Sequence, residues 1–171
     1  MNVLKEQYDF IKHTRKVLFH FCEKIDQEDY RKEVDGYGWG SIRNLHVHIA
    51  ECYQSWIGRF ALETGKPAVE ASKVTDVNEM RTVFESVDQL VYRFLENYEN
   101  RLDEKISRKV SWQEEEQELS PLWLFTHTIT HEFHHKGQIV TLTRALGYEP
   151  VDTDLLTPSD INRYLDYPEK G

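Results

Sequence analysis

A run of histidines between residues 127 and 135 has the residue types and the spacing of a metal-binding site. Four of the chain's eight histidines lie in this run, and His127, His131 and His135 recur every four residues. On an α-helix, residues four apart share one face, with Cβ atoms roughly 5–6 Å apart. Two imidazoles at that separation can reach one ion at Zn–N distances of roughly 2.0–2.1 Å. The spacing therefore predicts a divalent transition-metal site.

The histidine face of this helix also carries leucines. With about 100° per residue, His127 and His135 fall about 40° to either side of His131, and Leu124 and Leu142 lie close to the same direction. This face is therefore expected to point inward. A buried imidazole without a partner costs free energy. A metal ion is one partner for these rings, and ordered water or other side chains are the alternative.

A metal held by two histidines of one helix needs at least one more protein ligand. An earlier helical segment offers His46 and His48, which flank its apolar stripe at nearly equal angles. Periodicity alone does not choose between them. His13 and His20 are weaker candidates, because a lone histidine beside an apolar stripe is more often a boundary residue than a ligand.

The five residues 131–135 also match the H-E-x-x-H pattern of zinc peptidases, in which the glutamate is the general base. The surroundings fit that class poorly. The extended form of the pattern needs a histidine at position 141, which is Thr141. No strand-rich region precedes the pattern to hold an extended peptide. A zinc peptidase is therefore the less favoured alternative, and Glu132 is expected to be a bystander.

The elements that position these residues are predicted to be four long helices. Apolar residues recur at helical spacing in four segments, over residues 3–25, 42 to about 64, 76–102 and 121–146. Ser41 is a good N-cap for the second helix, and Ser120 before Pro121 is typical of the start of the fourth. Gly147 is a suitable stop for the fourth helix. The sequence predicts an all-α, four-helix bundle, a fold that builds metal sites between facing helices.

The connections contain three further features. Residues 106–112 have strand-like composition, so a short hairpin is expected between the third and fourth helices. The acidic run of Glu114, Glu115, Glu116 and Glu118 is interpreted as a solvated loop. The tail after Gly147 is expected to pack over the outside of the bundle, with a short helix around residues 158–165.

Composition limits the partners. The 171 residues suit one domain spanning 1–171, and the net charge of −9 argues against binding to a phosphate backbone. No apolar run approaches the ~20 residues of a membrane span, and the N-terminus lacks a signal-peptide pattern. The chain is expected to be cytoplasmic, to bind neither nucleic acid nor membrane, and to keep Cys22 and Cys52 as buried thiols.

Two stretches resemble the DinB/YfiT-like family. Residues 40–51, Gly-Ser-Ile-Arg-Asn-Leu-His-Val-His-Ile-Ala-Glu, are similar to its second helix, where a histidine follows a leucine-containing turn. Residues 130–139, Thr-His-Glu-Phe-His-His-Lys-Gly-Gln-Ile, are similar to its fourth-helix signature of two histidines followed by a basic residue, glycine and glutamine. The basic residue here is Lys136, where arginine is common. The resemblance extends over nearly the whole chain.

The resemblance implies an up-down-down-up bundle with a three-histidine site for nickel or zinc. Carried over by position, the ligands are His48, His131 and His135, and the choice of His48 comes from the resemblance. His127 is then a neighbour on the ligand face and His134 an edge residue. Lys136 is interpreted as a solvated surface lysine and Gly137 as the site of a close contact between helices. Gln138 is interpreted as a packing group or a hydrogen-bond partner of the ligands.

The resemblance also implies a class of activity. Characterised members include transferases that use a low-molecular-weight thiol and a thiol-dependent isomerase. The hypothesis is a metal-dependent enzyme, a transferase or hydrolase, that activates a small thiol or water toward a small-molecule substrate. No catalytic residue is assigned. A non-catalytic metal-binding stress-response protein is the alternative. A second apolar face on the fourth helix is formed by Leu122, Ile129, Phe133 and Val140, and either the C-terminal tail or a second subunit would cover it. The resemblance favours a homodimer, because relatives are often dimers.

Overall fold

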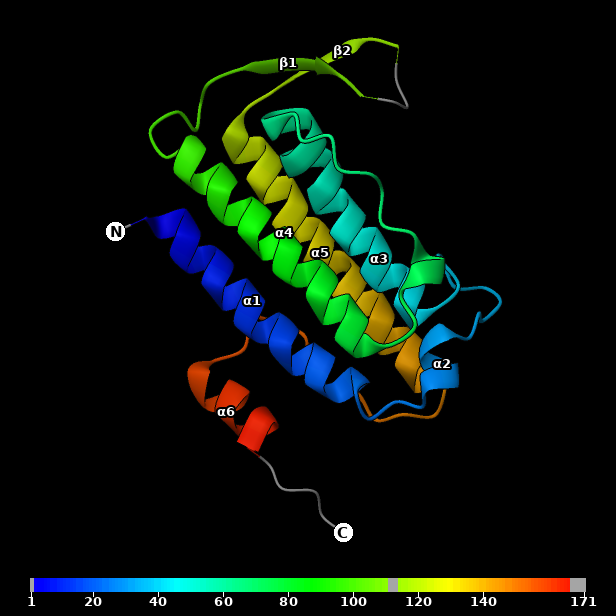
Figure 1. Ribbon diagram of the computed structural model, residues 1–171. Helices are drawn as coiled ribbons and strands as arrows, with labels where there is room; N and C mark the ends of the chain where they lie inside the picture. Colours follow the sequence, from blue (N-terminus) through cyan, green and yellow to red (C-terminus); the bar gives the residue numbers. More distant parts are fainter. Residues whose placement is uncertain (1, 111–113, 167–171) are drawn as a thin grey trace.

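The computed structural model of the protein describes residues 2–110 and 114–166. Within them, four long helices lie side by side, with α1 and α5 running in one direction and α3 and α4 in the other (Figure 1). Their bounds are Val3–Cys22 for α1, Ile42–Tyr53 for α3, Val77–Asn97 for α4 and Pro121–Ala145 for α5. The prediction of an all-α bundle with up-down-down-up order is confirmed.

Side-chain caps start each of the four helices. Asn2, Ser41, Asp76 and Ser120 each accept a hydrogen bond from the backbone N–H three residues further on. Such a cap stabilises a helix by about 1 kcal/mol relative to alanine. Gly147 follows α5 with φ +92°, a backbone conformation that glycine adopts without strain. The boundaries expected at Ser41, Ser120 and Gly147 are confirmed.

Three of the expected helices are divided or shortened. The first ends at Cys22, and a short helix α2, Gln27–Arg31, follows because the Asp26 side chain accepts from the Glu28 N–H and caps a new start. The second continues from α3 into a π-helical segment, η1, over Gln54–Ala61. Before α4, a single 3₁₀ turn, η2, covers Ala71–Lys73. The third helix ends at Asn97, short of the expected residue 102.

A two-stranded hairpin joins α4 to α5. Strand β1, Ile106–Lys109, pairs antiparallel with β2, Glu116–Leu119. Residues 111 and 112 of the expected strand-like segment lie outside the described residues. The Arg108 side chain anchors the hairpin to the bundle by donating to the Phe60 carbonyl at 3.0 Å. The loop interpretation of the acidic run is wrong for Glu116 and Glu118, because both pair within the ladder, although both side chains are exposed to water.

The C-terminal segment packs on the outside of the bundle, as predicted. Helix α6, Pro158–Asp166, lies against α1 (Figure 1). Leu156 is buried, and its N–H donates to Thr14 Oγ1 at 3.3 Å. On α5, Ile129 and Val140 are buried by the chain itself, whereas Leu122 stays 46% exposed. The homodimer expected from that face stays a prediction.

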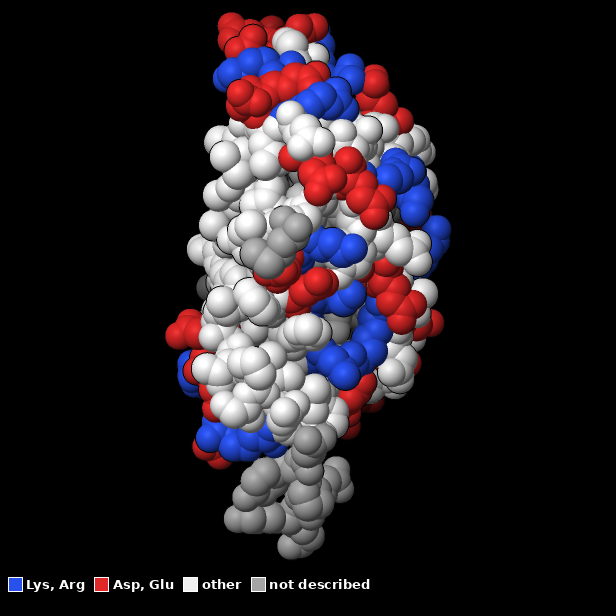
Figure 2. Space-filling model, turned by 90° about the vertical axis from the view of Figure 1, so that its left-hand side faces the viewer, with Lys and Arg blue, Asp and Glu red and all other residues white. Residues whose placement is uncertain are grey.

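The core lies between the four helices, and Cys22 and Cys52 are buried free thiols within it, as predicted. On the face shown in Figure 2, Lys and Arg gather on the right-hand half and are interleaved with Asp and Glu. A cleft of about 240 Å³ between α1 and α4 is lined by cations and carboxylates, and the Arg15 guanidinium lies 2.6 Å from the Asp88 carboxylate.

Among the described helices, none is long and apolar enough to cross a membrane.

Candidate metal centre

Helices α3 and α5 bring three histidines together. His48 of α3 meets His131 and His135 of α5, and one ligand nitrogen from each ring lies within 4.8 Å of the other two. The Nε2 atoms of His131 and His135 are 3.1 Å apart. Two nitrogens bound to one tetrahedral zinc ion would lie roughly 3.3 Å apart. The spacing of the α5 pair therefore matches one shared ion, and these are the three residues that the resemblance implied.

The other histidines take different positions. His46 is 1% exposed and lies in the core, where Nδ1 is 3.2 Å from the Tyr30 hydroxyl. His127 lies beside the cluster, with its ring centroid 5.8 Å from that of His131, as expected for a neighbour on the ligand face. His134 is exposed at the edge, also as expected. His20 pairs with Glu23 on the surface at 3.2 Å.

Gln138 sets the tautomer of one histidine in the cluster. Its side-chain oxygen lies 2.6 Å from His135 Nδ1, and its amide nitrogen lies 3.3 Å from His134 Nε2. Because the amide NH2 donates toward His134, the amide oxygen accepts a hydrogen bond from the N–H at His135 Nδ1. The His135 Nε2 lone pair then points toward His131. Metal-binding histidines usually hold their second ring N–H in such a hydrogen bond.

The cluster is kept neutral by its surroundings. Burial, reinforced by the neighbouring rings, lowers the pKa of His48 to about 4 and that of His131 to about 3. Burial also lowers the pKa of His135, partly offset by the Gln138 hydrogen bond. Among the described residues, the buried Nδ1 of His131 has no hydrogen-bond partner. Three neutral imidazoles that face one another with few protein partners form a donor set suited to a divalent transition metal.

Aromatic rings border the cluster on both sides. The Trp39 indole stacks on His48, with centroids 3.8 Å apart and an interplanar angle of 21°. On the other side, Trp123 stacks on His127 at 4.9 Å, and Trp56 meets His127 edge-on. Trp39 is 54% exposed and has φ +67°, which is unusual and strained for a bulky residue. Residue spacing alone did not mark this tryptophan as part of the site, although its place in the glycine-rich turn just before the His48 helix was a visible signal.

Glu132 and Lys136 directly follow His131 and His135 on α5, about 100° further round the helix, and lie in the core. Glu132 is 0% exposed and Lys136 is 1% exposed, and Lys136 Nζ lies 2.9 Å from Glu132 Oε1. The interpretation of Lys136 as a solvated lysine is therefore wrong, because α5 is enclosed on this side as well. Glu132 does not face the cluster, but it is a core residue with several partners rather than a bystander.

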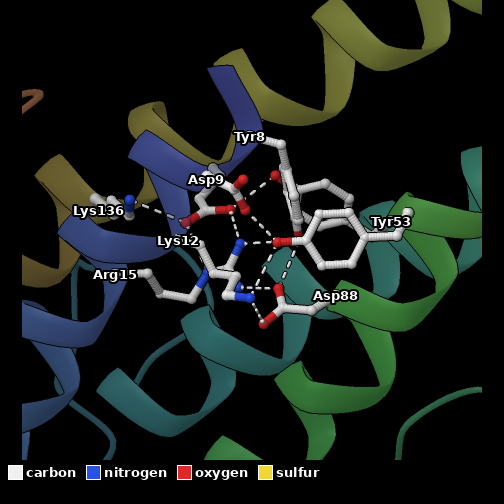
Figure 3. Close-up of polar contacts among 9 residues, drawn as sticks. Tyr8, Asp9, Lys12, Arg15, Tyr53, Asp88 and Lys136 are labelled. Carbon is white, nitrogen blue, oxygen red and sulfur yellow. Dashed lines mark hydrogen bonds and ion pairs between the residues drawn. The ribbon is translucent and has the colours of Figure 1, made fainter. Parts of the chain in front are cut away.

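These two residues belong to a buried ionic cluster, which we define as Tyr8, Arg15, Tyr53, Asp88, Glu132 and Lys136. Arg15 of α1 donates to both carboxylate oxygens of Glu132 at 2.9 Å and to Asp88 of α4 at 2.6 Å. The Tyr53 hydroxyl of α3 donates to Glu132 at 2.7 Å. Figure 3 shows the labelled members of the cluster converging from all four helices.

The ionic cluster explains why Arg15 is buried and why Glu132 stays ionised. Arg15 interrupts an otherwise apolar stripe on α1, yet it is 3% exposed. Burial alone would raise the pKa of Glu132, but Arg15 and Lys136 outweigh it and lower that pKa to about 2. The Glu132 carboxylate is therefore held ionised by its partners and is not free to act as a general base at the histidines. The i, i+4 pair of opposite charges on α5 was the signal for this cluster.

Gly137 does not make the close helix contact that the resemblance implied. A Cβ atom placed on it would meet no atom within 4 Å, apart from its own helix and chain neighbours. That interpretation is wrong, because this side of α5 borders an open pocket. The pocket has a volume of about 320 Å³ and is lined by residues that include Gly38, Leu45 and Gln138.

Comparison with known proteins agrees with this geometry. A search of curated proteins returned no match. The model of the DinB family matches residues 1–169, which is nearly the whole chain and includes both histidine-bearing helices. The bundle and its three-histidine cluster are thus part of one continuous match, and the chain belongs to the DinB family.

Proposed function

We propose that the protein is a metal-dependent enzyme whose divalent ion is held by His48, His131 and His135. The observation that supports this most directly is the convergence of three neutral imidazoles from two helices, with ligand atoms within 4.8 Å of one another. Three protein ligands leave a position for a further ligand, which is the pattern of catalytic rather than structural zinc sites. Nickel or zinc suits such imidazole ligands.

The protein residues act mainly by orienting the ligands. Gln138 holds His135 with its Nε2 lone pair toward the shared position, and Trp39 stacks on the His48 ring. The depressed pKa values of His48 and His131 keep both rings unprotonated and available near neutral pH. A bound ion lowers the pKa of water or of a thiol, which supplies a nucleophile at neutral pH.

The reaction class that we propose is transfer of a small thiol to an electrophilic substrate, or hydrolysis by water. Both reactions would use a coordination position that the three histidines leave free, and the thiol or water bound there would release its proton to solvent or to the leaving group. The alternative is a non-catalytic metal-binding protein in which that position is never used. A zinc peptidase is less consistent with the site, because Glu132 is bound by Arg15, Lys136 and Tyr53.

Metal content is the first test. Protein purified without a histidine tag and reconstituted with Ni²⁺ or Zn²⁺ should bind about one ion per chain, as one three-ligand site requires. Less than about a tenth of an equivalent after reconstitution would overturn the proposal. Incubation of the loaded protein with a thiol and monochlorobimane then separates a transferase, which accelerates conjugation, from a binder that does not.

Substitution of single histidines tests the ligand set. His48→Ala should weaken metal binding more than about 100-fold, because loss of a ligand exceeds the 10–100-fold cost of losing a partner behind one. His20→Ala is the matched control, because it removes a surface imidazole of α1 that pairs with Glu23 and lies outside the cluster. Unchanged metal affinity in His48→Ala would exclude His48 as a ligand.

A further inference from the structure

A pocket adjoins the histidine cluster, and we call it the loop pocket. It has a volume of about 320 Å³, within the range of small-molecule sites. Its lining comes from the loop before α3 and from the α5 face that includes His134 and Gln138. Gln138 also hydrogen-bonds His135 of the cluster at 2.6 Å. The loop pocket and the metal centre therefore share a wall.

Glycines keep the loop pocket open. Gly36, Gly38 and Gly137 line it, and a Cβ on any of them would meet no atom within 4 Å outside its local chain. Gly137 lies in the interior of α5, where glycine costs roughly 0.5–1 kcal/mol relative to alanine. No packing contact requires a glycine at this position, so its structural consequence is the space that it leaves in the pocket.

The loop that closes the pocket is preformed. The Val34 N–H donates to the Gly40 carbonyl at 2.8 Å, and the Gly40 N–H donates to the Tyr37 carbonyl at 3.1 Å. These bonds fix a compact turn that places Tyr37 on the pocket and stacks Trp39 on His48. One turn thus contacts both the pocket and the metal centre, and a ligand would not have to order it.

Among the described residues, the lining of the loop pocket contains polar groups, the exposed His134 imidazole included, but no Lys, Arg, Asp or Glu. Tyr37, Gln138 and Thr141 offer hydroxyl and amide groups, and Leu45 offers an apolar surface. A charged group entering such a pocket would lose hydration without gaining an ion pair. The cleft between α1 and α4, by contrast, is lined by Lys12, Lys16, Asp88 and other charged residues.

We propose that the loop pocket binds an uncharged, hydroxyl- or amide-bearing part of the molecule that reacts at the metal centre, an inference that rests on the proposed function. Gly137 is then a specificity-determining residue for that molecule. Thiols or substrates then bind less well when the part that enters the loop pocket carries a carboxylate or an ammonium group.

Cobalt-loaded protein and three small thiols test this inference. The probes are 1-thioglycerol, which is uncharged, 3-mercaptopropionate and cysteamine, and the readout is the thiolate-to-cobalt charge-transfer absorption. Gly137→Leu fills the pocket from a helix position that tolerates a side chain. Ala145→Leu is the matched control, because it adds a similar side chain to an exposed position of α5 away from the pocket. Thr141→Phe fills the same pocket independently.

Gly137→Leu should weaken binding of 1-thioglycerol at least about tenfold and binding of the two charged thiols less than about threefold, with cobalt affinity unchanged. Comparing each probe with itself in wild type and variant removes differences in intrinsic thiol acidity. Equal weakening of all three thiols, or no weakening of 1-thioglycerol in either pocket-filling variant, would overturn the inference alone. Failure of the wild type to bind cobalt would overturn the proposed function and the inference with it.

Discussion

The metal centre and the ionic cluster use adjacent residues of the same two turns of α5. His131 and His135 face α3, whereas Glu132 and Lys136 face α1 and the core. In the ionic cluster, two cations meet two carboxylates and the charges cancel within the protein. In the metal centre, three neutral rings face one another, and His131 Nδ1 has no hydrogen-bond partner among the described residues.

Because of this difference, the ionic cluster is suited to stabilising the fold and the metal centre is suited to binding a ligand. Buried ions are tolerated when other residues neutralise and hydrogen-bond them, and the ionic cluster meets that condition through contributions from all four helices. The metal centre leaves lone pairs unused at a position partly open to water. The ionic cluster is therefore expected to determine folding stability, and the metal centre to determine ligand binding. The following predictions test that division.

The largest expected effect is on stability. Glu132→Gln leaves Arg15 and Lys136 buried without their shared carboxylate, so the free energy of unfolding should fall by about 3–5 kcal/mol. Urea unfolding followed by circular dichroism measures the loss. Glu118→Gln is the control, because it weakens the exposed pair with Lys105 and should cost less than about 1 kcal/mol. Equal costs at the two positions would refute a special role for the ionic cluster.

The next effect is on metal binding. Gln138→Leu removes the acceptor on His135 Nδ1 and should weaken metal affinity about 10–100-fold, while the stability of the metal-free protein changes by less than about 0.5 kcal/mol. Competition with a chromogenic chelator measures the affinity. Gln138→Glu keeps an acceptor oxygen and should retain most of it. If Gln138→Leu destabilised the metal-free fold as much as Glu132→Gln did, the proposed division between the two regions would be wrong.

Acid should affect the two regions in pH windows that begin at different pH values and overlap below about pH 4.5. His48 and His131 have pKa values of about 4 and about 3 when folded, against 6.5 as the ordinary value. Below about pH 6.5 the unfolded chain takes up protons that the folded rings refuse, so stability falls as the pH drops toward 4. Glu132, with a folded pKa of about 2 against 4.5, adds a second loss below about pH 4.5.

Urea unfolding of metal-free protein at several pH values checks these windows. A His48→Gln/His131→Gln variant should lose less stability between about pH 6.5 and 4.5, and should keep the loss that Glu132 causes below about pH 3. The histidine effect should be modest, because both rings are partly exposed and water screens their interactions. If the double variant showed an unchanged slope between pH 6.5 and 4.5, the pKa depression at the metal centre would be disproved.

Local sequence signals were enough to predict α5 and its histidine face. Ser120 and Gly147 mark its ends, and the four-residue histidine spacing marks the ligand face. The choice between His46 and His48 was different, because both flank the α3 stripe. His46 lies in the core, where its Nδ1 is within hydrogen-bond distance of the Tyr30 hydroxyl of α2. A helix as short as α2 could not be recognised in the apolar pattern of the sequence.

The ionic cluster could not be placed for a related reason. Lys136 is buried because Glu132 lies beside it, and Glu132 is buried because Arg15 reaches it from 117 residues away. A charged residue on a helix is interpreted as surface unless its partner is known, and that partner is set by tertiary packing. The apolar periodicity that predicts the four helices contains no information about such a pair.

The smallest change in the free energy of unfolding is predicted for a substitution at Gly137. Gly137 lies between the two regions in sequence, directly after Lys136 and before Gln138, yet it contacts neither of them as packing. Gly137→Ala should therefore raise the free energy of unfolding by about 0.5–1 kcal/mol, the helix-propensity difference alone, and leave metal affinity unchanged. Thermal and urea unfolding with chelator competition check both quantities. A loss of stability would mean that α5 does need a glycine there for close packing, and the open wall of the loop pocket would then be wrong.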